Sequence, residues 1–399
     1  MTIHAVLSAE TPIRLWGLSS RQRLERTLKN ININSWLDHP SAASAGDSIL
    51  VLRGDYLYDE RLIRNLILQP GTVLQIDTED GYKAIAAHVA AADAPYVLAS
   101  LNGCTSDEPP PSLSYETTQS LVSTYHKKLR KIDPPYLLPI TEENKAALEK
   151  RLFSGSYKGV TDLVTKWVWP RPAQVVTRFC ACNGITPNMV TSLSLALVII
   201  AGLLFYHGFF ALGLVAAWSM TFLDTVDGKL ARVTVNSSYF GHLFDHAIDL
   251  ISPPLWYLIW GLGLESWQPG IPVSLKAAIW LIFIGYIAGR LAEGIFKQFL
   301  EPSGIFCWRP IDSYFRLITG RRNPSLILLT LALLAGRPDL GLFAVAFWTV
   351  ASSIFLVVRL LTGFYESRRT GPLRSWFLDI DPETQNPTLA QRCFSTNRS

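Results

Sequence analysis

Four aspartates stand within a sequence that is otherwise apolar: Asp224, Asp227, Asp245 and Asp249. On helices, the first two would be three residues apart and the last two four apart, so each pair would project from one face of its own helix. Two antiparallel helices could then direct all four carboxylates to one point. Carboxylates in apolar surroundings need a cation. Oxygen ligands in this number predict Mg²⁺, Mn²⁺ or Ca²⁺ rather than zinc or copper.

Small residues and one arginine accompany these acids. Gly228 and Ala231 lie on or beside the face of the first acidic pair, and Gly241 lies one turn before the second pair, so a ligand could approach the ions. Arg232 could reach a phosphate. One alternative is a solvated loop in which the acids pair with Lys229 and Arg232. Another is the ion relay of a transporter, which would explain the acids but neither the glycines nor the arginine.

The whole pattern, DxxDGxxAR followed after eight residues by GxxxDxxxD, resembles the signature of the CDP-alcohol phosphotransferase family at every position. Members of that family are integral membrane enzymes that transfer a substituted phosphoryl group from a CDP-alcohol to a second alcohol and release CMP. The resemblance implies two divalent ions, Mg²⁺ or Mn²⁺, held by Asp224, Asp227, Asp245 and Asp249. It assigns catalysis to Asp249 and Asp245, with Asp249 as the base for the attacking hydroxyl.

A second resemblance lies just before the first apolar segment, in Thr186-Pro187-Asn188-Met-Val-Thr191. It is similar to the Pro-Asn-x-x-Thr sequence of family members, where it helps to hold the nucleotide. An N-cap at Thr186, with Pro187 in the first helical position, is a compatible interpretation. Together the two resemblances imply that the following residues bind nucleotide or phosphate: Asn188, Thr191, Gly228, Ala231, Arg232 and Gly241.

Apolar segments dominate the second half of this chain of 399 residues, of which 49% are hydrophobic. We expect six membrane helices, although several segments are shorter than the roughly 20 residues of a straight crossing. The candidates are residues 191–206, 209–222, 239–264, 277–296, 324–336 and 342–364.

Lysines and arginines gather on one side of these six segments, which predicts that this side faces the cytoplasm. The residues on that side are Lys229, Arg232, Lys297, Arg309, Arg316, Arg321, Arg322, Arg368, Arg369 and Arg374. Met1 to Glu10 contain no visible signal peptide. We therefore expect a multi-pass protein of the inner (cytoplasmic) membrane, with both termini and the aspartates on the cytoplasmic side.

Arg290 lies deep within the fourth apolar segment and needs a partner there. It could pair with Glu293 or extend to the membrane interface. Our hypothesis is that Arg290 lines a pocket for the phosphate or carboxylate of the acceptor, with Arg316 and Arg321 as further candidates.

The amino-terminal part alternates strand-like and helical stretches, which favours a small three-layer, Rossmann-like α/β domain. Ser20 is expected to cap a helix through Lys29. The expected strands are residues 4–7, 48–52, 72–77, 84–88 and 96–100.

The order of these pieces resembles the nucleotide-binding half of sugar nucleotidyltransferases. Arg14 stands at that family's Arg-Leu pair and Asp55 at its metal-binding aspartate. That family opens with a glycine-rich loop that cradles a triphosphate, but residues 8–13 contain no glycine and Glu10 would repel phosphates. We predict a degenerate relative. The alternatives are a bifunctional enzyme that also makes its CDP-alcohol from CTP, and a silent membrane scaffold whose α/β head binds a partner.

The expected domains are the α/β domain (1–105), a linker with a helical connector (106–157), a juxtamembrane amphipathic segment (158–186), the membrane domain (187–364) and a cytoplasmic tail (365–399), mostly extended. The net charge of +4 is too small to favour nucleic acid as a partner. We expect a donor and an acceptor alcohol, at least one of them a lipid, together with membrane lipids. The family resemblance also implies phospholipid or inositol-phosphate synthesis and a homodimer.

Overall fold

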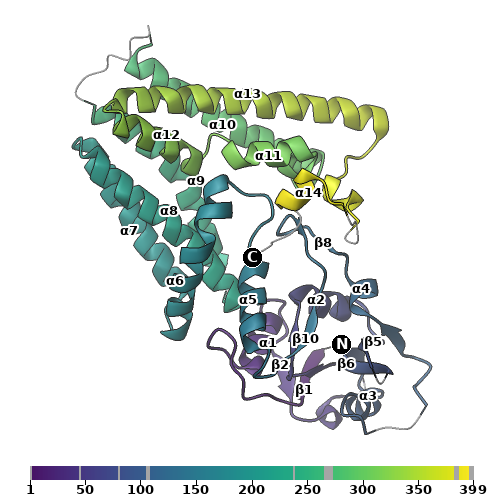
Figure 1. Cartoon of the computed structure of the whole chain (residues 1–399). Helices are drawn as coiled ribbons and strands as arrows, with labels where there is room; N and C mark the ends of the chain where they lie inside the picture. The colour runs from purple at the N-terminus through teal and green to yellow at the C-terminus, as the bar shows by residue number, and fades with distance from the viewer. Residues whose placement is uncertain are drawn as a thin grey trace. The chain divides into compact units, whose positions relative to one another are not determined.

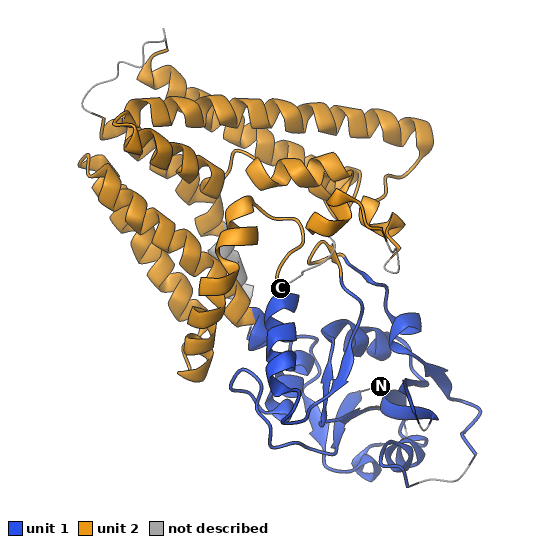
Figure 2. Ribbon diagram, in the orientation of Figure 1, with its two compact units in different colours: residues 1–126, 133–156, 232–236 blue, residues 127–132, 157–231, 237–399 orange. Residues whose placement is uncertain are grey.

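The structure is a computed structural model of the chain (Figure 1). It describes residues 2–44, 46–79, 81–104, 108–236, 239–264, 273–381 and 386–394, without the side chains of 239–240 and 242–246. The chain divides into two compact units, which Figure 2 distinguishes by colour. Unit 1 comprises residues 1–126, 133–156 and 232–236, and unit 2 comprises residues 127–132, 157–231 and 237–399.

A mixed sheet of six strands in the order β2-β1-β3-β6-β5-β7 forms the centre of unit 1. Strand β1 is parallel to β2 and β3, β6 is antiparallel to β3 and β5, and β7 is parallel to β5. The strands are β1 (Ile3–Ser8), β2 (Ser35–Leu37), β3 (Ser48–Arg53), β5 (Thr72–Thr78), β6 (Gly81–Ala90) and β7 (Ser114–Glu116).

Each face of this sheet has its own hydrophobic cluster, because successive residues of a strand point to opposite faces. Leu50 and Leu52 of β3 pack with α1 (Ser20–Lys29) and α2 (Glu60–Leu68). Ile49 and Val51 pack with α3 (Ala94–Leu101). The expected α/β domain with helices on both faces is therefore confirmed.

Two local predictions in unit 1 were wrong. Residues 96–100 belong to helix α3, whose buried Ala94, Val97 and Leu101 follow a helical period, and Pro95 in its first turn favours helix initiation. The N-cap of α1 is Ser19 rather than Ser20: its side chain accepts a hydrogen bond from the Gln22 amide, and the Gln22 side chain completes a capping box.

The predicted helical connector was also largely wrong, because prolines and short extended stretches divide residues 115–151. Strand β7 joins the main sheet, and β10 pairs antiparallel with β4. The remaining elements of this part are β4 (Tyr56–Tyr58), α4 (Thr118–Leu121), β8 (Tyr125–His126), β9 (Lys131–Ile132), β10 (Leu137–Pro139) and α5 (Lys145–Gly155). A 3₁₀ turn, η1, covers Pro40–Ala42.

Unit 2 is helical. A π-helical turn, η2 (Val164–Val168), leads into α6 (Pro170–Cys182). The long helices are α7 (Pro187–Tyr206), α8 (Phe210–Val233), α9 (Tyr239–Leu262), α10 (Leu275–Phe299) and α13 (Pro338–Thr370). The shorter elements are η3 (Ile305–Cys307), α11 (Pro310–Ile318), α12 (Arg322–Leu334), η4 (Trp376–Asp379) and α14 (Leu389–Phe394). Helices α10 and α13 run side by side (Figure 1).

All six expected membrane segments are helices, and within the described residues four of them are long and apolar enough to cross a bilayer: α7, α8, α10 and α13. The apolar parts of α9 (Ala247–Leu262) and α12 are shorter. The fold therefore fits a multi-pass membrane protein, while exactly six crossings are not established. Large apolar side chains exposed on these helices, such as Leu203, Leu212, Ile284 and Val358, suit contact with lipid.

Indole groups link the helices inside unit 2. Trp256 and Trp260 of α9 are fully buried, and their N–H groups donate to the Val198 carbonyl of α7 (3.0 Å) and the Pro338 carbonyl of α13 (3.1 Å). The tail is more ordered than predicted in its described part, because α13 continues to Thr370 and the buried Phe377 and Phe394 anchor η4 and α14.

Candidate active site

Asp227 lies on α8 and is bound by a residue of α7. The Thr191 hydroxyl donates to Asp227 Oδ2 at 2.7 Å, and both side chains are buried. Thr186 caps α7 by accepting from the Met189 amide, so the α7 segment that begins with proline presents Thr191 one turn inside the helix. The N-cap interpretation of Thr186 is thus confirmed, and Thr191 contacts the aspartate motif directly.

Asp224 and Asp249 converge on a single guanidinium. The Nη2 atom of Arg322 lies 2.5 Å from Asp224 Oδ2, and its Nη1 atom lies 2.6 Å from Asp249 Oδ1. Asp224 is on α8, Asp249 on α9 and Arg322 at the first position of α12. The predicted meeting of carboxylates from two neighbouring helices is therefore observed for this pair.

These residues come from four helices of unit 2. Thr191 is near the start of α7, and Arg322 begins α12. Asp224 and Asp227 are the fifteenth and eighteenth of the 24 residues of α8, and Asp249 is the eleventh of the 24 residues of α9. The site therefore joins the starts of α7 and α12 to the central parts of α8 and α9.

Carboxylate oxygens are the donors that Mg²⁺ and Mn²⁺ prefer. Asp224 and Asp249 each place one such oxygen against Arg322, and Asp227, one turn after Asp224, is held by the Thr191 hydroxyl. The side chain of Asp245 lies outside the described residues. Among the side chains that are described, no three His, Cys, Asp or Glu lie together closely enough to hold a metal ion.

The other residues expected to bind nucleotide lie on α7, α8 and α9. Gly228 and Ala231 are partly accessible on α8, and Gly241 is partly accessible on α9. Arg232 is exposed near the end of α8, and Asn188 is exposed in the first turn of α7.

A second charged cluster surrounds Glu293 of α10. Its carboxylate forms ion pairs with Arg321, which precedes α12, and with Arg290 at 3.8 Å. Arg290 also donates to the Tyr286 hydroxyl (3.2 Å), which itself donates to the carbonyl of Leu250 (3.0 Å), the residue after Asp249. The cluster is thus linked to the aspartate site by two hydrogen bonds.

Arg316 of α11 adds a third cation. It and Arg321 lie over the ring of Phe306, with guanidinium carbons 5.6 and 5.4 Å from the ring centroid. Burial and the neighbouring Arg321 lower the pKa of Arg316 to about 9, which leaves it charged at neutral pH. Its Nη1 is buried and has no hydrogen-bond partner within the described part of the chain. Arg290, Arg316 and Arg321 therefore lie together around Glu293.

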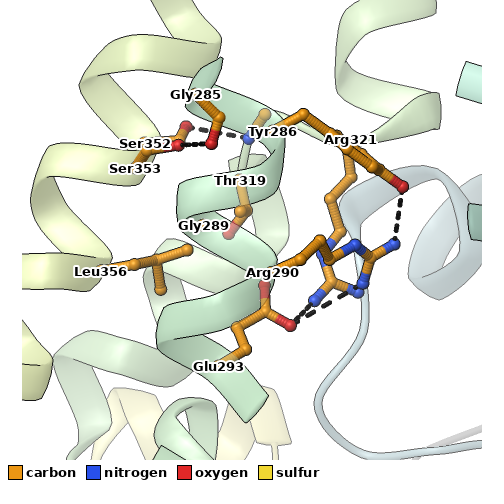
Figure 3. Close-up of a pocket in the computed structure, with 11 residues that line it drawn as sticks. Gly285, Tyr286, Gly289, Arg290, Glu293, Thr319, Arg321, Ser352, Ser353 and Leu356 are labelled. Carbon is orange, nitrogen blue, oxygen red and sulfur yellow. Dashed lines mark hydrogen bonds and ion pairs between the residues drawn. The ribbon is translucent and has the colours of Figure 1, made fainter. Parts of the chain in front are cut away.

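Figure 3 shows the small pocket at this cluster, with Arg290 and Arg321 directed towards Glu293. Its volume of about 10 Å³ holds roughly one water molecule. Ser352 and Ser353 of α13 line the other side, where Ser352 accepts from the Gly320 amide and Ser353 donates to the Gly285 carbonyl. A phosphorylated ligand would have to displace Glu293 from the arginines.

The contact of Arg322 with the aspartates was not predicted from the sequence, where Arg322 served only to orient the helices. The pair formed by Asp162 and Asn323 was not predicted either: Asn323 Nδ2 donates to Asp162 Oδ1 at 2.9 Å and fixes the residue next to Arg322. The sequence does carry a signal, since Arg322-Asn323-Pro324 begins an apolar helix with a cation that needs a partner.

In unit 1, Asp55, which stands at the position of the metal-binding aspartate of nucleotidyltransferases, is already paired with an arginine. Asp55 accepts two hydrogen bonds from Arg53, at 2.9 and 2.5 Å, and this pairing raises the pKa of Arg53. Glu10 pairs with Arg21 at 3.3 Å, and Arg14 is exposed. This arrangement adds no support to the resemblance of unit 1 to nucleotidyltransferases.

Comparison with known proteins gives two relatives of this chain. One is an archaetidylinositol phosphate synthase of Pyrococcus horikoshii, 35% identical over 102 residues, which are 25% of this chain and 53% of the relative. The other is the uncharacterized CDP-alcohol phosphatidyltransferase class-I family protein 2 of Dictyostelium discoideum, 33% identical over 88 residues, which are 21% of this chain and 22% of the relative. The chain thus spans about half the length of the first relative and about a fifth of the second.

A family profile matches the segment that contains α7 to α10 and all four motif aspartates. The match covers residues 184–299 and has the description CDP-alcohol phosphatidyltransferase. Members of this family are transferases for substituted phosphate groups. Residues 184–299 of this chain therefore match the family model of a CDP-alcohol phosphatidyltransferase domain.

Proposed function

We propose that this protein is an integral membrane CDP-alcohol phosphotransferase, which transfers a substituted phosphoryl group from a CDP-alcohol to an acceptor alcohol and releases CMP. The observation that carries the proposal is the convergence of Asp224 and Asp249, from two helices within the matched family segment, on one positive charge. A place that already gathers carboxylates around a cation suits divalent ions and a pyrophosphate donor. The membrane helices suit a lipid as donor, acceptor or product.

Each residue of the site would have its own role in this reaction. Asp224, Asp227, Asp245 and Asp249 would hold two Mg²⁺ or Mn²⁺ ions, which when bound stabilise negative charge on the transferred phosphoryl group and on the leaving oxygen. Asp249 would accept the proton of the attacking hydroxyl, since it lies at the accessible edge of the site, with 36% of its side chain exposed. Thr191 would keep Asp227 in a single orientation.

The nucleotide would lie on the small residues. Gly228, Ala231 and Gly241 leave room for it, and the exposed Arg232 would bind a phosphate oxygen. Asn188, exposed at the start of α7, would contact the base or ribose.

The acceptor would bind at the arginines around Glu293. Arg290, Arg316 and Arg321 surround Glu293, and Arg316 also interacts with Asp162, so three cations face two carboxylates. A buried Nη1 of Arg316 has no hydrogen-bond partner among the described residues, so the cluster favours an anion. Because Tyr286 links Arg290 to the backbone next to Asp249, an anion bound there would place its hydroxyl towards the base. The name of the Pyrococcus relative makes inositol phosphate the first acceptor to test.

The proposal also covers assembly and location. The motif resemblance supports the assembly and the pathway, and the distribution of lysine and arginine supports the location. We infer a homodimer through the membrane helices, a site that faces the cytoplasm, and a role in phospholipid or inositol-phosphate-type synthesis.

The test is release of CMP by the purified full chain in detergent. CDP-diacylglycerol and small CDP-polyols are offered as donors, with inositol phosphate, glycerol phosphate and lipid alcohols as acceptors, in Mg²⁺, Mn²⁺ or EDTA. We expect CMP release that requires the metal and one acceptor. Asp249→Asn should lower kcat by about 100-fold or more, as expected for loss of a general base.

The matched control is Asp339→Asn, which removes a carboxylate that pairs with Arg337 at the start of α13. It should keep wild-type turnover. Equal activity of Asp249→Asn and wild type would contradict the proposal. Pyrophosphate is measured in parallel with CTP as substrate: its release would favour the bifunctional alternative, which the pairing of Asp55 with Arg53 argues against.

A further inference from the structure

Arg322 binds both Asp224 and Asp249 through separate terminal nitrogens. We propose that Arg322 is a built-in counter-cation that competes with divalent ions for these two aspartates and thereby sets the metal affinity of the site. The inference rests on the proposed function, since it takes Asp224 and Asp249 as metal ligands.

The geometry makes the competition direct. Contacts of 2.5 and 2.6 Å are short, charge-assisted hydrogen bonds, and only 13% of the Arg322 side chain is exposed. A Mg²⁺ ion would approach the same carboxylates to about 2.1 Å. Two positive charges so close together repel each other strongly where little water screens them. A metal ion bound by both aspartates must therefore displace the guanidinium.

Arg322 is presented from a fixed position. The next residue, Asn323, is buried and donates to Asp162 Oδ1 (2.9 Å) and to Thr165 Oγ1 (3.3 Å), while the Thr165 amide also donates to Asp162 (3.0 Å). These bonds hold the first turn of α12 in place. The backbone of Arg322 is therefore fixed at the start of α12, which places the guanidinium beside the aspartates. When a metal ion displaces the guanidinium, only the side-chain torsions of Arg322 have to change.

One donor of Arg322 is unused. Its Nε is buried and makes no hydrogen bond within the described residues. The two aspartates thus hold the guanidinium through its terminal nitrogens alone, which leaves it incompletely bonded in this position. Such a side chain can be replaced by a stronger cation at a smaller loss than one with every donor satisfied.

The consequence is a site with two cationic states. Without metal, Arg322 compensates two carboxylates that would otherwise repel each other. With metal, the divalent charge takes over this role. Removing Arg322 should therefore destabilise the metal-free protein and tighten metal binding, whereas a residue that merely supports the fold would not change metal affinity.

The experiment uses the purified full chain in detergent, without substrate. Binding of Mn²⁺ is followed by the electron paramagnetic resonance signal of the free ion, and the melting temperature is measured in EDTA and in Mn²⁺. For Arg322→Gln we expect Mn²⁺ to bind about tenfold more tightly or better, equivalent to about 1.4 kcal/mol. The melting temperature in EDTA should fall, and the increase caused by Mn²⁺ should be larger than in the wild type.

Arg359→Gln is the matched control, because Arg359 also pairs with a buried carboxylate, Asp312, at 2.6 and 2.8 Å. It should lower the melting temperature equally with and without Mn²⁺ and leave the Mn²⁺ affinity unchanged. If Arg322→Gln cannot be purified as a folded protein, Arg322→Lys is measured instead. Lysine keeps the charge but lacks the planar fork that reaches both aspartates, so tighter Mn²⁺ binding is again expected.

If the wild type binds Mn²⁺ and the Arg322 variant binds it with the same or a weaker affinity, the inference is overturned while the proposed function stays intact. Failure of wild type and variant alike to bind Mn²⁺ would overturn both.

Discussion

At the scale of single residues, the motif aspartates differ in their partners although they belong to one signature. Asp227 receives a neutral hydroxyl from Thr191, whereas Asp224, one turn away on the same helix, receives a full positive charge from Arg322. A hydroxyl fixes the direction of a carboxylate without neutralising it. Thr191 therefore acts as a positioning residue for Asp227, in the way that supporting groups orient metal ligands.

Replacing Thr191 tests this role. Thr191→Val keeps the shape of the side chain but removes the hydroxyl, so we expect metal affinity and CMP release to fall by about 10- to 100-fold. Thr191→Ser should restore most of both. Ser192→Ala is the control, since the Ser192 hydroxyl donates to the Asn188 carbonyl of its own helix. A Thr191→Val protein with wild-type Mn²⁺ affinity would show that the hydroxyl is not needed.

Arg290 provides the second test at this scale. Arg290→Ala removes one of the cations around Glu293 and the bond to Tyr286, so the KM for the acceptor should rise by about tenfold or more, as expected for loss of a charged hydrogen bond. The KM for the donor should change little. Steady-state kinetics with each substrate varied in turn gives both values. Equal increases in the KM values for donor and acceptor would show that Arg290 does not belong to the acceptor site.

At the scale of elements, a buried polar cluster joins the segment before α6 to α11 and α12. Asp162 accepts from Asn323 and from the Thr165 amide, and Arg316 lies close enough to act on its charge. Burial opposes ionisation of Asp162, but Arg316 and these hydrogen bonds outweigh it, so the pKa of Asp162 is below its ordinary value of 3.8. The ionised carboxylate therefore stabilises the folded state.

The sign of the pH dependence follows from that shift. The folded protein binds the Asp162 proton less readily than the unfolded chain, so the stabilisation is fully present above pH 3.8 and is lost as the pH falls through the lower folded pKa. Asp162→Asn should lower the free energy of unfolding by about 1–3 kcal/mol at neutral pH. The difference from wild type should shrink below pH 3.8. Thermal melts of both proteins over a range of pH measure this difference in stability. A difference that stays constant with pH would show that ionised Asp162 does not stabilise the folded state.

Sequence patterns predicted elements well where one physical signal dominates. The apolar segments became helices, and the strands 48–52 and 72–77 lie within β3 and β5, because long apolar or alternating runs have few other solutions. Residues 96–100 were misassigned because a short apolar run fits a buried helix as well as a strand. The partners of Asp224 and Asp249 could not be predicted, since Arg322 lies more than seventy residues further along and only packing brings it near.

At the scale of the whole chain, the number of crossings decides whether the parts of the site share one side of the membrane. Four crossings, or six with α9 and α12, would both leave the residues before α7 and after α13 on one side. With six crossings the start of α12 would lie on that side too, together with the start of α7 and the end of α8, whereas with four it would lie on the opposite side. The contact of Arg322 with Asp224 therefore favours six. The lysine and arginine distribution predicts that the side shared by these residues is the cytoplasm.

Cysteine labelling in a bacterial expression host tests the orientation. One variant keeps Cys104, which is exposed in unit 1, as its sole cysteine, and a second carries only His207→Cys, in the exposed turn after α7. A maleimide that cannot cross the membrane should label His207→Cys but not Cys104 in intact spheroplasts, and Cys104 in inverted vesicles. The reverse pattern would place the aspartates outside the cytoplasm, where CTP-derived donors would not reach them, and the proposed reaction would then need a different donor.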